Sequence, residues 1–101
     1  MYRTPIHPGE ILGEELEELN ITATELARTL RVPANRITQI VTGKRSVTAD
    51  TALRLARHLG TSADFWMNLQ KSYELRTTRA ELGNNLDGIP ERPRPDATLA
   101  C

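Results

Sequence analysis

Apolar residues recur three or four positions apart through most of the chain, which predicts a series of short amphipathic helices. The first expected helix begins at His7-Pro8, where the missing N–H of proline costs nothing, and ends near Asn20. Its apolar positions are Ile11, Leu12, Leu16 and Leu19. Gly13 lies inside this helix and is expected to weaken it by about 1 kcal/mol.

Two further helices are expected between residues 22 and 43. Thr22 and Glu25 have the spacing of a capping box, in which each side chain accepts a hydrogen bond from the other residue's backbone N–H. Pro33 disfavours helical geometry at the preceding residue, so a new helix is expected to start at Ala34 and to end at Gly43. The residues expected to face inward are Leu26, Ala27, Leu30, Val32, Ile37, Ile40 and Val41.

Two more helices complete an expected domain of residues 1–82. Thr48 is the expected cap of a fourth helix that stops at Gly60, and Ser62 opens a fifth that runs to about residue 81. Glycine and proline then recur too often for regular structure, so residues 83–101 are expected to form a disordered tail. The predicted fold class is therefore all-α, with five helices.

The helix pair within residues 22–43 is the most informative part of the sequence. The small side chain of Ala27 lies where the two helices would cross and allows their close approach. A short turn between two such helices is typical of a helix-turn-helix, whose second helix enters the major groove of DNA. The alternative is an ordinary helical hairpin with a solvated polar face.

If the pair binds DNA, its outward polar residues acquire defined roles. Carboxamides pair with adenine and guanidinium groups with guanine, so the expected base-reading residues are Asn35, Arg36, Thr38 and Gln39. Free amides at the start of the preceding helix and basic residues after the recognition helix suit the DNA backbone. The expected phosphate contacts are Thr22, Thr24, Lys44 and Arg45.

The distribution of charge favours this interpretation, although the net charge of the 101 residues is zero. Residues 1–20 carry one arginine and five glutamates, whereas residues 21–60 carry seven basic and two acidic residues. A basic middle segment beside an acidic first helix suggests a local patch that faces phosphate. An ordinary solvated surface is the alternative explanation of the same pattern.

Several other classes of protein are not expected. No apolar stretch approaches the length of about 20 residues that spans a bilayer, and the start of the chain lacks the pattern of a signal peptide. The single cysteine, Cys101, permits no internal disulfide and suits the cytoplasm. His7 and His58 lie far apart, and no cluster of histidine, cysteine and aspartate has the spacing of metal ligands, so we expect no metal. No nucleophile lies beside a base in the sequence, so we expect no catalytic site, and we expect no cofactor.

The sequence resembles the HigA-type antitoxins, a branch of the Cro/repressor-like (XRE) helix-turn-helix group, over about residues 5 to 80. The matching segments are His7-Pro8-Gly9-Glu10-Ile11-Leu12, Thr24-Glu25-Leu26-Ala27, residues 37–45, Ala52-Leu53-Arg54-Leu55-Ala56, Gly60-Thr61-Ser62 and residues 65–70. The resemblance implies a lambda-repressor-like domain that dimerises and binds a palindrome in its own promoter. It also implies that the protein neutralises a HigB-type toxin, an mRNA endonuclease.

Three positions depart from the pattern of that family. Arg31 stands in the turn where glycine is usual, so it must adopt a strained conformation or shift the turn. Pro33 stands where serine often caps the recognition helix, and the lost cap removes about 1 kcal/mol of local stability. Gly13 replaces a residue that is commonly charged. The first two departures bear on how the recognition helix is presented to DNA.

The aromatic residues of the fifth helix suggest where two subunits would meet. We expect Phe65 and Leu69 inside the domain, and part of Trp66 or Tyr73 at the interface of a homodimer. The acidic first helix is either a surface for a basic toxin or a solvated face, and the tail either orders on the toxin or has no such role. The alternative functions are a free-standing repressor and a protein-interaction module that does not bind DNA.

Overall fold

The computed structural model describes residues 5–93, and every regular element in that range is helical. The helices are α1 (Pro8–Leu19), α2 (Ala23–Leu30), α3 (Ala34–Val41), α4 (Ala49–Leu59), α5 (Ala63–Leu82) and the 3-10 helix η1 (Gly83–Gly88). The predicted all-α fold with five α-helices is therefore confirmed. None of the described helices is long and apolar enough to cross a membrane.

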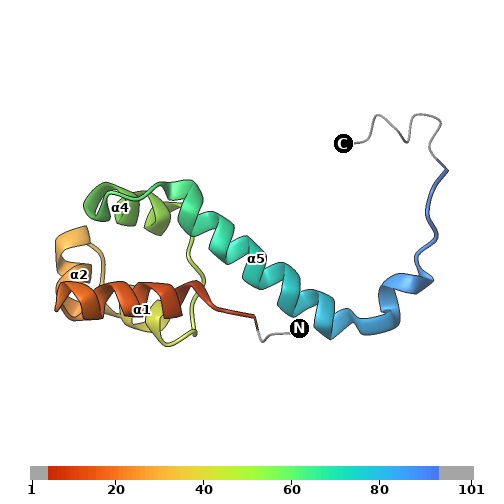
Figure 1. Cartoon of the computed structure of the whole chain (residues 1–101), viewed down its shortest axis with the longest axis horizontal. Helices are drawn as coiled ribbons and strands as arrows, with labels where there is room; N and C mark the ends of the chain where they lie inside the picture. Colours follow the sequence, from red (N-terminus) through yellow and green to blue (C-terminus); the bar gives the residue numbers. More distant parts are fainter. Residues whose placement is uncertain (1–4, 94–101) are drawn as a thin grey trace.

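The core lies where α1 to α4 meet the first half of α5 (Figure 1). Helix α3 packs against both α2 and α1, and α4 packs against α5. The buried apolar side chains are Leu12, Leu16, Leu26, Ala27, Leu30, Ile37, Ile40, Val47, Ala52, Leu55 and Trp66. The seven that lie on α1 to α3 occupy the apolar positions that the helical periodicity marks, because that periodicity places them on one side of each helix. The burial of Val47, Ala52, Leu55 and Trp66 was not predicted.

Local sequence sets most of the helix ends. Thr22 and Glu25 form the expected capping box, and the Ser62 hydroxyl accepts a hydrogen bond from the N–H of Phe65. Gly60 ends α4 in the left-handed region with φ 78°. Arg31 ends α2 in the same region, with φ 63°, so it takes the strained conformation rather than shifting the turn.

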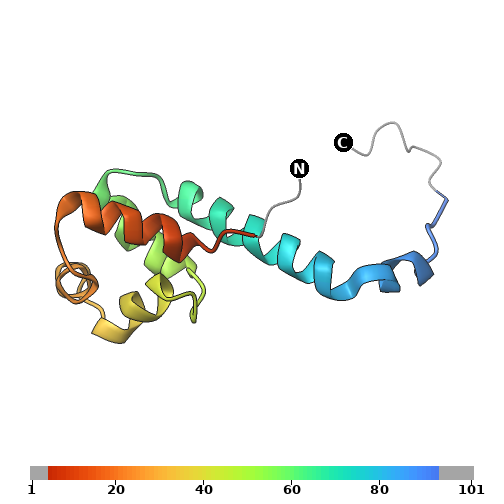
Figure 2. The ribbon, with the colours of Figure 1, turned by 60° about the horizontal axis from the view of Figure 1, so that its bottom comes forward.

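Helix α5 extends well beyond the core. Figures 1 and 2 show its second half running away from the other four helices, and the molecule measures 53 × 26 × 26 Å. Beyond it, η1 continues helical geometry over residues 83–88, which differs from the irregular structure expected from residue 83 onward. No residue of η1 is buried, and the N–H of Ile89 donates to the carbonyl of Leu86 at its end. Residues 89–93 have no regular structure, as expected, and the remainder of the expected tail, residues 94–101 with Cys101, lies outside the described residues.

The rotation of α5 about its axis corrects the prediction for its aromatic residues. Trp66 is 1% exposed, and its indole N–H donates to the Thr61 hydroxyl at 2.8 Å, so Trp66 belongs to the core rather than to a subunit interface. Phe65, which was expected inside, is 42% exposed. Leu69 packs against the core as expected. The buried side of α5 holds Trp66 and Gln70, and the Gln70 side chain accepts a hydrogen bond from the N–H of Val47 in the α3–α4 loop.

His7 joins three parts of the domain. Its Nδ1 atom accepts a hydrogen bond from the N–H of Gly9 at 2.8 Å and so caps α1. Its ring packs edge-on against Tyr73 of α5, with centroids 4.8 Å apart. The backbone of Arg45, in the α3–α4 loop, also faces this ring. Burial lowers the pKa of His7, although the nearby Glu10 carboxylate and the Arg45 backbone oppose that shift.

We therefore expect acid to destabilise the fold through His7. The folded protein holds this ring neutral, whereas in the unfolded chain it binds a proton near its ordinary pKa of about 6.5. The stability that neutral His7 contributes is thus present above pH 6.5 and is lost as the pH falls below it through the folded pKa. The protonated ring also no longer accepts the N–H of Gly9.

Chemical denaturation at pH 7.5 and pH 5.5 measures this effect. In His7→Asn, the amide oxygen keeps an acceptor for the helix cap but does not titrate. The loss of stability between the two pH values should therefore be smaller in His7→Asn than in the wild type. His58→Asn, at an exposed position of α4, is the control and should behave like the wild type. An equal loss in the wild type and His7→Asn would contradict the role of His7.

Candidate nucleic-acid interface

Helices α2 and α3 form a tightly packed pair joined by a short turn. Ala27 is 1% exposed at the crossing, and the inward side of α3 buries Ile37 and Ile40 completely. The turn needs the left-handed conformation of Arg31, after which the N–H of Val32 donates to the carbonyl of Ala27. Burying the apolar side of α3 leaves its polar side facing outward.

The four residues expected to contact bases all lie on the accessible side of α3. Asn35 is exposed on the first turn, and Arg36, Thr38 and Gln39 are partly exposed. Pro33 precedes the helix without a side-chain cap, as its sequence predicts. The geometry therefore leaves this surface open to a ligand. Two of its residues, Arg36 and Gln39, form hydrogen bonds with other side chains.

Arg36 belongs to a charged network that links three helices. Its Nη1 donates to Asp50 Oδ1 at 2.8 Å, and Nε of Arg54 donates to the same oxygen at 2.6 Å. Arg54 also donates to the carbonyl oxygen of Leu30, the last residue of α2, at 2.7 Å. The hydrogen bond from Arg54, assisted by Arg36, keeps the pKa of the Asp50 carboxyl below its usual value. Asp50 thus remains an anion between two guanidinium groups.

Gln39 is held by the loop that follows α3. The Nε of Arg45 donates to its Oε1 at 2.9 Å, which orients the carboxamide and leaves its nitrogen and the second lone pair of its oxygen for another partner. Gly43 makes this turn with φ 81°, and the exposed Lys44 follows it. Arg45 and Arg36 line the same surface hollow. The structure therefore brings Arg36, Gln39 and Arg45 together at one place.

The start of α2 differs from the simple anion site expected there. The Thr22 hydroxyl accepts from the N–H of Glu25 at 3.0 Å, and the Glu25 carboxylate accepts from the N–H of Thr22 at 2.8 Å. Thr24 lies exposed on the first turn. A phosphate at this end would meet the Glu25 carboxylate as well as the helix dipole, so its attraction is reduced.

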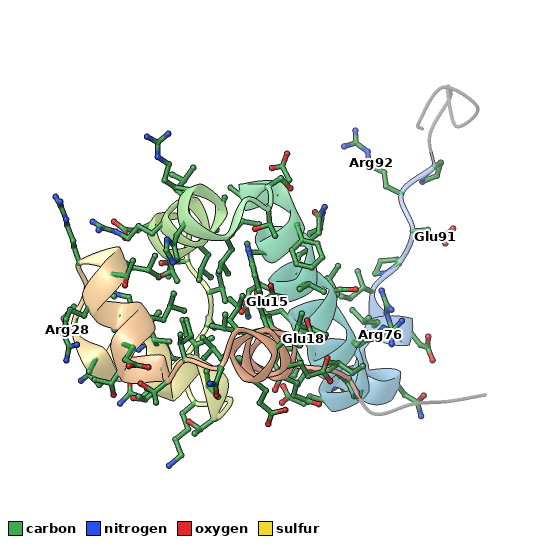
Figure 3. All side chains as sticks on the ribbon, turned by 60° about the vertical axis from the view of Figure 1, so that its left-hand side comes forward. Glu15, Glu18, Arg28, Arg76, Glu91 and Arg92 are labelled. Carbon is green, nitrogen blue, oxygen red and sulfur yellow. The ribbon has the colours of Figure 1, made fainter. Side chains whose placement is uncertain are left out.

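Charges of opposite sign occupy different helices. Figure 3 shows Glu15 and Glu18 on α1, and Arg28 projecting from α2 on the side away from α5. Helix α1 carries no basic residue, whereas α2 to α4 and their loops carry most of the basic residues of the chain. Among residues 5–93, no cluster of histidine, cysteine, aspartate or glutamate is suited to hold a metal ion.

Sequence reasoning missed two residues that shape this surface. Asp50 holds Arg36, and the only sequence signal was its i,i+4 spacing from Arg54. Gln70 is 4% exposed; its Oε1 accepts from the N–H of Val47 and its Nε2 donates to Glu74. Gln70 thereby fixes the loop that carries Lys44 and Arg45 onto α5. No feature of the sequence separates Gln70 from a surface glutamine.

Comparison with known proteins agrees with this geometry. A helix-turn-helix family model matches residues 12–66. Virulence-associated protein I of Dichelobacter nodosus is 50% identical over 72 residues, which are 70% of this chain and 67% of that protein. Antitoxin HigA-1 of Vibrio cholerae is 37% identical over 78 residues, which are 76% of this chain and 73% of that protein.

Solved structures are similar over nearly the whole chain. An addiction module antidote protein of a HigA family from Coxiella burnetii superposes with a TM-score of 0.86 at 46% identity, covering 89% of this chain and 100% of that one. The Pseudomonas aeruginosa antitoxin HigA, solved with the higBA promoter, gives 0.84 at 46% identity, covering 89% and 99%. The chain therefore belongs to the helix-turn-helix family, within the group that contains the HigA antitoxins.

Proposed function

We propose that this protein is an antitoxin that represses its own transcription by binding a palindromic operator as a dimer, and that it neutralises a HigB-type toxin. The observation that carries the DNA-binding role is the accessible polar side of α3, where Arg36 and Gln39 are oriented beside Arg45. The relative from Pseudomonas aeruginosa, solved with its promoter, supports the same use of the fold. The role requires no catalysis or cofactor, and it is exercised on DNA in the cytoplasm.

Each part of the interface has a separate task in this proposal. Asn35, Arg36, Thr38 and Gln39 contact base edges in the major groove. Lys44, Arg45 and Thr24 contact phosphates and set the register of α3 on the duplex, while Thr22 chiefly caps α2. Neutral net charge is compatible with this role because residues 21–60, which include α2 to α4 and their loops, carry seven basic and two acidic residues.

We propose that the homodimer forms through the projecting half of α5 rather than through Trp66. Leu75 and Leu82 lie two turns apart on one side of α5 and are 53% and 36% exposed. The partly exposed Tyr73 lies at the near end of this segment and remains a candidate for the edge of the interface. A twofold dimer would present two copies of α3 to two half-sites about 34 Å apart, or to a multiple of that spacing.

Co-expression with the neighbouring reading frame tests the function directly. The tagged full chain should co-purify with a small basic RNase, restore growth to cells that express it, and shift a duplex from its own upstream region. A shift without any toxin partner would identify a free-standing repressor. Toxin binding without a shift of any upstream duplex would identify an interaction module and would overturn the repressor role.

A further inference from the structure

Asp50 is an anion at the edge of a surface that we propose to bind DNA, where a negative charge is unexpected. A carboxylate near phosphate weakens binding unless it is paired. Its side chain is 55% exposed, so it contributes little to the core. Both of its hydrogen-bond donors are arginines, and one of them, Arg36, is a proposed base-reading residue.

The network is built so that Asp50 itself cannot move freely. Arg54 lies one turn after Asp50 on α4 and binds it at 2.6 Å. Arg54 also donates to the carbonyl of Leu30, so the end of α2 fixes its position. The guanidinium of Arg36 therefore donates to a carboxylate that α4 carries and that Arg54 connects to the end of α2.

The contact uses only one edge of the Arg36 guanidinium. Its Nη1 donates to Asp50, and among residues 5–93 neither Nε nor Nη2 has a hydrogen bond within the chain. Nε and Nη2 form one edge of the fork, with two parallel donors that match O6 and N7 of guanine. Holding one end of a long side chain reduces the rotamer freedom that would be lost on binding.

We infer that Asp50 is a positioning residue that orients Arg36 toward one base pair of each half-site and so determines specificity there. This inference rests on the proposed DNA-binding function. Asp50 acts through Arg36 and does not supply affinity of its own. Removing its charge should therefore weaken binding to the preferred sequence without weakening binding to unrelated DNA.

The chain offers a matched control for the change of charge. Asp64 occupies the second position of α5, after Ser62-Ala63, as Asp50 occupies the second position of α4, after Thr48-Ala49. Both aspartates are exposed in the first turn of a helix. Asp50→Asn and Asp64→Asn thus remove the same charge from equivalent helix positions, but only the first lies beside Arg36.

The test is selection from a duplex library with a randomised core, using the full chain and its variants. The wild type should enrich a twofold-symmetric site, and Arg36→Ala should lose the preference at one base pair of each half-site. Asp50→Asn should lose it at that same pair and bind the wild-type site about tenfold more weakly. Its affinity for a scrambled duplex should be no lower than that of Asp64→Asn, and Asp50→Glu should restore the preference in part.

Three results would overturn the inference. If Asp50→Asn keeps every base preference, Asp50 does not position Arg36. If the variant loses affinity for all sequences in proportion to a fall in the melting temperature of the protein, the role of Asp50 is structural alone. The variant could also bind the preferred site more tightly than Asp64→Asn does, which would show that Asp50 withholds Arg36 from DNA. A wild type that enriches no sequence would instead overturn the proposed function, and the inference with it.

Discussion

Replacing Arg36 and Gln39 together with alanine should abolish sequence-specific DNA binding while leaving the helical circular dichroism unchanged. Both side chains lie on the outer side of α3, away from the buried Ile37 and Ile40, so their truncation does not open the core. Each bidentate base contact provides about 1–3 kcal/mol of discrimination. Losing two in each subunit should lower affinity for the preferred duplex by about 100-fold or more in a mobility-shift titration.

Lys44→Ala is the comparison variant for this experiment. The exposed Lys44 is expected to contact phosphate, so its loss should weaken binding to all duplexes alike and flatten the dependence of affinity on salt. The double variant should retain its binding to unrelated DNA. Undiminished specific affinity in the double variant would show that α3 does not read the bases.

Gly9→Ala should unfold the domain or destabilise it by about 3 kcal/mol or more. A Cβ atom at Gly9 would overlap the backbone carbonyl oxygen of Ile40, which cannot rotate away as a side chain could. Position 9 lies in the first turn of α1, where that helix crosses α3. Differential scanning calorimetry should show a melting temperature lower by about 12 °C or more.

Gly13→Ala, on the same helix, should have the opposite effect. A Cβ atom there meets only a Val41 methyl at 3.6 Å, which is ordinary contact. Alanine in place of glycine within a helix should therefore stabilise the fold by about 1 kcal/mol. If both substitutions destabilised the fold equally, the close contact between Gly9 and the Ile40 carbonyl would not be the cause of the loss in Gly9→Ala.

The order and the ends of the helices could be predicted because they depend on neighbours in sequence. Pro8, the Thr22–Glu25 capping box, Ser62 and Gly60 each act within a few residues, and each lies where the structure begins or ends a helix. The arrangement of α2 and α3 as a helix-turn-helix could also be predicted, from the spacing of their apolar residues, the small side chain of Ala27 and the short turn. The outward position of the proposed base-contacting residues then follows from helical periodicity alone.

The rotation of α5 and the partners of Arg36 and Gln39 could not be predicted. Two sides of α5 carry residues that could face inward, and the buried side holds Trp66 together with Gln70, which bonds to a residue 23 positions away. Arg36 donates a hydrogen bond to Asp50, which lies 14 positions later in the sequence. Such contacts exist only after the helices have packed, so no spacing along the chain reveals them.

The length of α5 has a consequence for the distance between two half-sites. Its first turns are fixed in the core by Trp66, and its last turns reach the proposed dimer contact without a break. A helix of 20 residues is about 30 Å long, so a relative rotation of about 5° at its far end would displace the core by about 2.6 Å. Mutations at Leu75 or Leu82 would then alter the operator spacing that the protein tolerates, even though these residues lie far from any base.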